Sequence, residues 1–221
     1  MDTTIAAAGA RVRARPTSAR QIAAGWPFGA AAGLPWLVLF AIMRLQPSFG
    51  GEPRGALALL PFVLLGATVC GWAAAGAYLA RASGGGRDAA AASGTAFVTA
   101  TLFGLMLALR VEEFAVEQGQ ADRALLPVVL ATTFGLSMAL ALGAATMATG
   151  LALRRGRAWL PALGVGALVF AAYLVVALAF NLIPEWRVGG GHSAMVKVAF
   201  AANLIVGTLG GAAALRTLRV R

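Results

Sequence analysis

The chain has 221 residues, 60% of them hydrophobic and 12% charged, with a formal net charge of +10 and a mean hydropathy of +0.81. Soluble domains usually carry about 25% charged residues because their surfaces must be polar, so this composition excludes an ordinary water-soluble domain. With Cys70 and His192 as the only cysteine and histidine, the chain alone forms neither an intrachain disulfide nor a metal site built mainly from these residues. We expect no metal site, and the sequence identifies no cofactor.

Six apolar segments follow in chain order, each with the roughly 20 residues that an α-helix needs to cross a ~30 Å hydrocarbon core. The third begins in an alanine-rich stretch (DAAAASGTA), and the fourth is long enough to tilt or to project beyond the membrane. Their continuous apolar runs favour helices over a β-barrel, whose strands alternate in polarity. The predicted fold class is therefore all-α, a polytopic integral membrane protein with a six-transmembrane-helix bundle. We place the spans at residues 26–45, 56–80, 90–111, 124–153, 159–182 and 194–215.

Basic residues are distributed unequally between the two sides of the predicted bundle. With the N-terminus in the cytoplasm, 12 of the 18 lysines and arginines lie on the inner side, and the inner face carries the whole net charge of +10. Because lysine and arginine concentrate in cytoplasmic loops, this bias predicts that both termini are cytoplasmic. The arginines do not form a basic helix with interleaved aromatics, so we expect no nucleic-acid partner. The inner set comprises Arg11, Arg13, Arg15, Arg20, Arg81, Arg87, Arg154, Arg155, Arg157, Arg216, Arg219 and Arg221.

This topology divides the chain into a membrane domain and two basic tails. Trp26 and Trp159 lie at predicted inner boundaries, as the residues of an interfacial aromatic belt do. Trp72 lies within a span, where we expect it to pack against other helices. We expect a multi-pass protein of the cell (inner or plasma) membrane, in contact with the lipid bilayer and with other membrane subunits. Its parts are a cytoplasmic N-terminal tail (1–25), the transmembrane domain (26–215) and a cytoplasmic C-terminal tail (216–221).

Small residues recur on one face of three predicted helices. Such faces allow helix backbones to approach closely, so we favour intramolecular packing, with docking of a partner subunit or the lining of a pathway as the alternative. Asn203, near the middle of the sixth span, needs a hydrogen-bond partner, and we favour a structural bond over contact with a substrate or ion. Thr132, Thr133 and Ser137 lie at a similar depth. The three faces comprise Gly135, Ala139, Gly143, Thr146 and Gly150, then Gly66, Cys70, Ala73, Ala74 and Ala77, and finally Ala199, Asn203, Gly207, Gly210 and Gly211.

The segment between the third and fourth spans carries four carboxylates. They could gather a cation or present an outer acidic patch to a basic partner, although a solvated connector is the simpler interpretation. A calcium loop would need tighter ligand spacing and a turn glycine, which the segment lacks. The four residues are Glu112, Glu113, Glu117 and Asp122.

No catalytic constellation emerges, so we do not expect an enzyme. Ser137 and His192 are the nearest approach to a Ser–His pair, but their predicted depths differ. No carboxylate lies deep in a span, which counts against an independent proton-driven pump. We therefore expect a non-catalytic integral membrane subunit that scaffolds or stabilises a larger membrane protein complex. The alternative is a transport component, either a permease or a substrate-capture subunit energised by a partner, with a polar cavity around Asn203.

Overall fold

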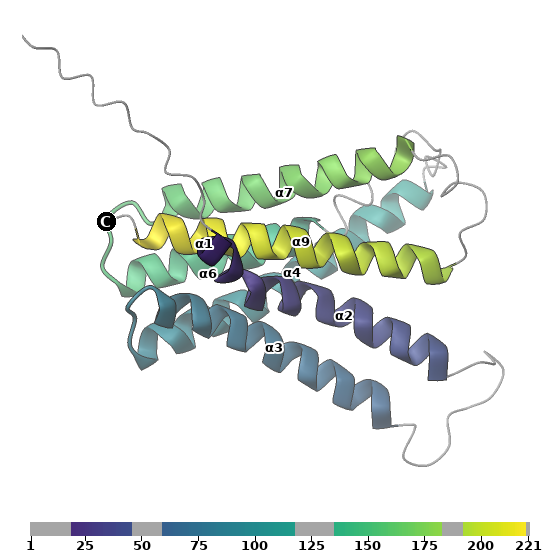
Figure 1. The fold of residues 1–221 in the computed structure, drawn as a ribbon, viewed down its shortest axis with the longest axis horizontal. Helices are drawn as coiled ribbons and strands as arrows, with labels where there is room; N and C mark the ends of the chain where they lie inside the picture. The colour runs from purple at the N-terminus through teal and green to yellow at the C-terminus, as the bar shows by residue number, and fades with distance from the viewer. Residues whose placement is uncertain (1–18, 46–58, 118–134, 183–191, 220–221) are drawn as a thin grey trace, which may run out of the picture.

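The structure, a computed structural model, describes residues 19–45, 59–117, 135–182 and 192–219. Within these ranges the chain forms seven α-helices and no strand (Figure 1), so the all-α prediction is confirmed there. The helices are α1 (Ala19–Ala23), α2 (Trp26–Leu45), α3 (Leu60–Ala82), α4 (Arg87–Glu117), α6 (Leu136–Ala152), α7 (Trp159–Leu182) and α9 (His192–Arg219).

Four of these helices contain stretches long and apolar enough to cross a membrane, and the fold is therefore that of a helical membrane protein. The stretches are Phe62–Ala82, Arg87–Val111, Trp159–Ala179 and Phe200–Arg219, and α6 is a shorter apolar helix of 17 residues. The first part of the predicted fourth span lies outside the described residues.

Two helices extend beyond the spans that hydropathy predicts. α4 begins at Arg87 rather than at residue 90 and continues to Glu117 rather than ending at residue 111. Alanine has the highest intrinsic helix propensity, and Asp88 in the first turn complements the positive end of the helix dipole. The alanine-rich start is thus only moderately apolar and yet strongly helical. α9 likewise runs to Arg219, so most of the predicted C-terminal tail is helical.

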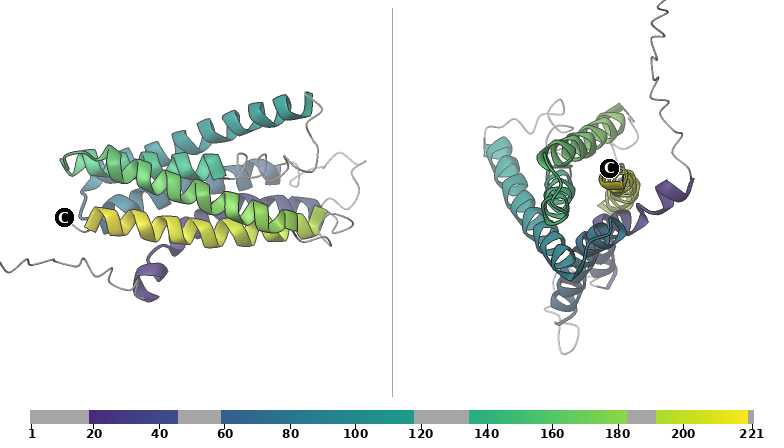
Figure 2. Two further views of the ribbon diagram at one scale, coloured as in Figure 1. Left: turned by 90° about the horizontal axis from the view of Figure 1, so that it is seen from above. Right: turned by 90° about the vertical axis from the view of Figure 1, so that its left-hand side faces the viewer.

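The long helices pack as neighbours in chain order, and the last closes onto the first. α2 packs on α3, α3 on α4, α4 on α6, α6 on α7 and α7 on α9, and α9 returns to lie against α2. Successive helices run in opposite directions, so the turns at 83–86 and 153–158 lie at one end of the bundle with the start of α2 and the end of α9 (Figures 1 and 2).

The helices α2 and α9 approach each other so closely that glycines form their contact. A Cβ atom added at Gly207 would lie 2.9 Å from the carbonyl oxygen of Phe28 and 3.0 Å from the Cα of Gly29. A Cβ added at Gly29 would overlap the hydroxyl of Thr208. Close backbone approach of this kind replaces hydrophobic driving force with van der Waals contact inside a membrane.

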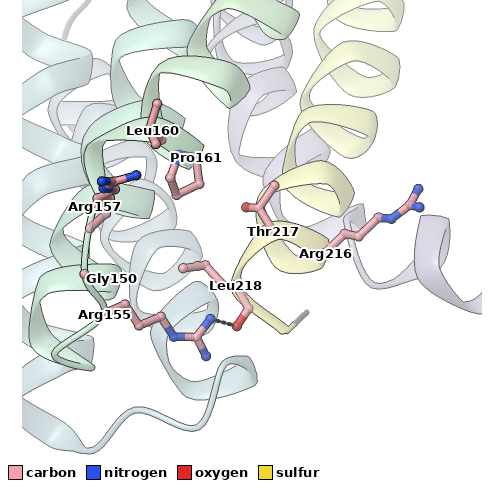
Figure 3. Close-up of a pocket in the computed structure, with 10 residues that line it drawn as sticks. Gly150, Arg155, Arg157, Leu160, Pro161, Arg216, Thr217 and Leu218 are labelled. Carbon is pink, nitrogen blue, oxygen red and sulfur yellow. Dashed lines mark hydrogen bonds between the residues drawn. The ribbon is translucent and has the colours of Figure 1, made fainter. Parts of the chain in front are cut away.

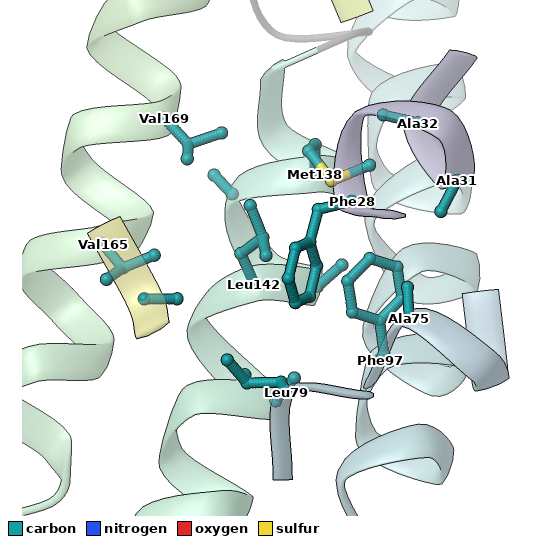
Figure 4. Close-up of a cluster of buried hydrophobic side chains, with 14 of the residues drawn as sticks. Phe28, Ala31, Ala32, Ala75, Leu79, Phe97, Met138, Leu142, Val165 and Val169 are labelled. Carbon is teal, nitrogen blue, oxygen red and sulfur yellow. The ribbon is translucent and has the colours of Figure 1, made fainter. Parts of the chain in front are cut away.

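Phe28 lies at the centre of the core, where side chains from six helices meet (Figure 4). It is fully buried, and its ring centroid is 5.9 Å from that of Tyr78 and 6.5 Å from that of Phe97. Tilted aromatic pairs at such separations have favourable quadrupole interactions. The same cluster includes Leu79, Leu142, Val165 and Val169.

Buried polar groups join the helices by hydrogen bonds. The indole Nε1–H of Trp72 donates to the carbonyl of Ala31 over 3.0 Å and so joins α3 to α2. Trp72 is buried, as a packing residue should be, and the bond satisfies the only polar atom of its ring. Between α4 and α6, the hydroxyl of Thr149 donates to that of Ser93 over 3.0 Å, and Ser93 donates to the carbonyl of Ala145 over 3.3 Å.

Candidate functional site

The small residues of α9 face two neighbouring helices. Gly207 and Gly211 contact α2, where a Cβ added at Gly211 would overlap the ring of Phe28. Gly210 faces the other way, and a Cβ added there would lie 2.5 Å from the Cγ2 of Val169 on α7. These glycines therefore lie in contacts within the bundle.

The small residues of α6 lie mainly along α7. A Cβ added at Gly135 would lie 2.8 Å from the Cβ of Tyr173, and Gly143 also faces the α7 backbone. In the opposite direction, a Cβ added at Gly166 of α7 would lie 3.3 Å from the carbonyl oxygen of Ala139. The two helices thus approach through small residues on both sides.

Asn203 is paired with Tyr173, which is not among the partners predicted for it. The hydroxyl of Tyr173 on α7 donates to the Oδ1 of Asn203 over 2.5 Å, and both side chains are buried. Ser137 packs instead against α4, where a Cβ added at Gly104 would meet its backbone. Thr132 and Thr133 lie outside the described residues. The signal for Tyr173 was available, because a tyrosine in the middle of an apolar span needs a partner for its hydroxyl.

The small residues of α3 divide between an inner and an outer face. A Cβ added at Gly94 of α4 would lie 2.9 Å from the carbonyl oxygen of Ala73, so Ala73 lies at the α3–α4 contact. Gly66, Cys70 and Ala74 are exposed, and no atom of the described residues lies within 4 Å of a Cβ added at Gly66. We call these three residues the outer α3 face. Over residues 66–74, the exposed side chains are those of Gly66, Ala67, Cys70 and Ala74.

The predicted acidic patch is described only in part. Because α4 continues to Glu117, Glu112, Glu113 and Glu117 all lie on its last turns, and Asp122 lies outside the described residues. The carboxylate of Glu113 forms an ion pair with Arg110 at 2.6 Å, with the two side chains 58% and 73% exposed. An exposed pair of this kind contributes only about 0–1 kcal/mol, so it marks a solvated helix end rather than a built site.

At the opposite end of the bundle, a pocket of about 370 Å³ lies between the turn that joins α6 to α7 and the last turn of α9 (Figure 3). Arg155, Arg157 and Arg216 line it, and no carboxylate is among the described residues that do. Several further arginines lie on the helix ends at this end of the bundle. They are Arg20, Arg81, Arg87, Arg154 and Arg219.

Two arginines at this end bind backbone carbonyls at helix C-termini. The guanidinium of Arg155 donates to the carbonyl of Leu218 in the last turn of α9 (Figure 3), and the Nε–H of Arg219 donates to the carbonyl of Ala82 over 3.3 Å. Helix C-termini have unpaired carbonyls and a partial negative charge, so both bonds are favourable. They tie the ends of α9 and α3 to parts of the chain far away in sequence.

The turn after α6 has arginines in backbone conformations that glycine usually takes. α3 ends with Gly84 at φ 89°, and the amide of Gly85 donates back to the carbonyl of Ala80 over 2.8 Å. α6 ends with the same hydrogen-bond pattern, but Arg154 occupies the left-handed position at φ 53°. Arg157 follows at φ 55°. A left-handed backbone conformation costs a residue other than glycine roughly 1–2 kcal/mol. Arg154 and Arg157 therefore both add backbone strain to this turn.

In the sequence these arginines indicate topology, and no local pattern predicts a pocket. A pocket here requires that the turn RRGR meets the C-terminal end of α9, which lies some sixty residues further along the chain. The bond between Arg155 and Leu218 is one such contact, across 63 positions. No family model matches the chain, and no curated protein or solved structure matches it either.

Proposed function

We propose that this protein is a non-catalytic integral membrane subunit that stabilises a larger membrane protein complex. The observation that carries the proposal is the outer α3 face. The small-residue faces of α6 and α9 are covered by neighbouring helices, whereas Gly66, Cys70 and Ala74 of α3 point out of the bundle. These residues lie within the membrane-length stretch Phe62–Ala82. A small-residue face at this depth fits another transmembrane helix, because it allows two backbones to approach closely.

Over nine-residue stretches, the exposed surface of α7 is bulkier than that of α3 at 66–74, while α3 itself exposes Phe62, Val63 and Leu65 directly before Gly66. Between residues 163 and 171 the surface of α7 includes the exposed leucines Leu163 and Leu168 among its smaller residues. Flexible acyl chains pack readily around such bulky side chains. The exposed residues of α4 between 91 and 99 are again all small, and bulky exposed residues such as Leu102 and Phe103 follow them. The small residues are Ala91, Ala92, Thr95 and Thr99.

Replacing Gly66 with leucine should disrupt the complex without disturbing the bundle. The position has open space around it, so the new side chain fits the isolated chain but would overfill a close contact with another helix. Overfilling of a packed contact costs about 1–3 kcal/mol. We therefore expect the Gly66→Leu chain, extracted from native membranes in mild detergent, to migrate on native gels as the free chain while wild type migrates as a larger complex.

Gly164→Leu is the matched control for this experiment. Gly164 on α7 is also a helical glycine, and within the described ranges no atom lies within 4 Å of an added Cβ, so leucine should be tolerated there and the complex retained. If wild type itself migrates only as the free chain, or if both leucine variants retain the complex, the proposed docking face is wrong.

We further propose that all six long helices span the membrane, with both termini in the cytoplasm. This arrangement is supported by the alternation of helix directions and by the gathering of most of the described arginines at the end of the bundle where α2 begins and α9 ends, with Arg44 and Arg110 near the other end. Trp26 and Trp159 are exposed at the same end, where an aromatic belt would lie.

Labelling of single cysteines tests this orientation. In a Cys70→Ala background, Glu113→Cys should react with a membrane-impermeant maleimide added to intact cells, because its helix end faces outward in the proposed topology. Gly156→Cys, which is exposed on the turn between α6 and α7, should react only after the membrane is permeabilised. The reverse pattern of labelling would invert the topology.

The transport alternative has less support from the described residues. It places a polar cavity around Asn203, but the side chain of Asn203 is bonded to Tyr173 and Ser137 packs against α4. These contacts favour a structural role for Asn203 and Ser137, which is to hold helices together, over contact with a transported substrate.

A further inference from the structure

We propose that the pocket at the arginine-rich end binds the phosphate group of an anionic phospholipid. The inference goes beyond the role of the outer α3 face and rests only on the proposed membrane orientation of the bundle. The pocket lies at the end of membrane-length helices, where lipid headgroups would be found. Basic pockets between transmembrane helices on the cytoplasmic side are suited to anionic headgroups.

The charge of the pocket favours a phosphate. Of its three lining arginines, Arg155 is engaged with the carbonyl of Leu218, whereas no hydrogen bond within the described part of the chain engages the guanidinium of Arg157 or Arg216. Figure 3 shows the guanidinium of Arg157 beside the first turn of α7, while Arg216 extends to the other side of α9. Arg157 is thus placed to contact a ligand over α7, and Arg216 adds to the positive field. Arginine binds phosphate oxygens through two parallel N–H donors.

The helix geometry adds to this charge. Ala158, Leu160 and Pro161, around the start of the 24-residue helix α7, line the pocket. The amide of Leu160 already donates to the carbonyl of Arg157, and Pro161 has no N–H, so the start of α7 contributes mainly the partial positive charge of its helix dipole, which attracts anions. The opposing negative charge at the end of α9 is reduced where Arg155 binds the carbonyl of Leu218. The two helix ends and the arginines together therefore leave a net positive site.

The apolar part of the lining distinguishes a lipid from a free phosphate ion. Leu160, Pro161 and Leu218 form the wall beside the arginines, and the neighbouring Trp159 is half exposed. A hydrated inorganic ion gains nothing from such a wall. The glycerol and first methylene groups of a phospholipid would cover it, because they continue from the phosphate into the membrane.

The strained turn provides a matched pair of variants. Arg154 and Arg157 lie in the same turn and both have left-handed backbones, but only Arg157 lines the pocket. Arg157→Gly and Arg154→Gly each remove one positive charge and one strained residue, so both chains should fold and melt at or above the temperature of wild type. They differ in whether a donor is removed from the pocket.

The test is lipid binding to the purified chain in mild detergent, followed by native mass spectrometry. We expect wild type to bind dioleoylphosphatidylglycerol in preference to dioleoylphosphatidylcholine, and excess inorganic phosphate to leave the bound lipid in place. Arg157→Gly should weaken binding of the anionic lipid by about tenfold or more, as expected for the loss of a charge-assisted hydrogen bond. Arg154→Gly should bind like wild type.

Three results would overturn the proposal. Equal losses in the two variants would mean that total charge, rather than the pocket, attracts the lipid. Equal binding of the two lipids by wild type would exclude recognition of an anionic headgroup. Displacement of the lipid by inorganic phosphate would identify free phosphate as the ligand. Because the isolated chain is measured, none of these results depends on whether Gly66→Leu disrupts a complex.

Discussion

Replacing Phe28 with alanine is expected to lower the free energy of unfolding by roughly 2–3 kcal/mol. Its ring is fully buried and contacts side chains from several helices, so its removal leaves a cavity at the point where they meet. The corresponding loss in a soluble core is about 3–5 kcal/mol. We expect less here because apolar atoms in a membrane protein are removed from lipid rather than from water, which leaves mainly the packing term.

Reversible unfolding in mixed detergent micelles, followed by tryptophan fluorescence, measures this effect. Phe103→Ala is the control, because Phe103 is exposed on α4 and its ring does not belong to the core. If the Phe28→Ala chain has the same free energy of unfolding as the Phe103→Ala chain, the aromatic centre of the bundle contributes little to its stability.

Replacing Gly211 with alanine is the second substitution with a large expected effect. A methyl group at this position overlaps the ring of Phe28, and that ring is itself confined by Tyr78 and Phe97. Because the ring cannot move away without disturbing its neighbours, α9 and α2 must separate. We expect a destabilisation of about 1–3 kcal/mol, as is typical of an overfilled core.

A double substitution distinguishes this steric explanation from a change in helix propensity. Gly164→Ala adds the same methyl group to a helical glycine with open space around it, and it should be neutral or slightly stabilising. When Phe28→Ala and Gly211→Ala are combined, the loss should be smaller than the sum of the two single losses, because the smaller residue at position 28 makes room for the methyl group. Additive losses would contradict direct contact as the cause.

The positions of several helices could be predicted from the sequence because lipid limits the solutions. Spanning segments must satisfy their backbone groups internally, and the spans predicted at 26–45 and 159–182 coincide with α2 and α7. Hydropathy follows the apolar middle of a helix and misses its polar ends. The predicted spans therefore end at residues 111 and 215, although α4 continues to Glu117 and α9 to Arg219. The end of α6 also lacks the usual glycine, since Arg154 takes its place.

The candidate sites could be predicted less well, for two physical reasons. A transmembrane helix is apolar on all sides, so its sequence does not show which small-residue face turns inward. The packing of the helices alone determines that Gly66 is exposed and that Gly211 contacts Phe28. The arginine-lined pocket depends on a contact between the turn at 153–158 and the end of α9, and such long-range contacts have no local signature in a single sequence.

The close contact between α2 and α9 has a consequence for biosynthesis. Of the long helices described, α2 is the first to leave the ribosome and α9 the last, yet these two pack together through Gly29 and Gly207. The glycine surface of α2 therefore remains uncovered by α9 until all the helices between them have been synthesised. During that interval it is accessible to lipid, to insertion factors or to helices of other proteins, and the contact between the two helices forms only when α9 arrives.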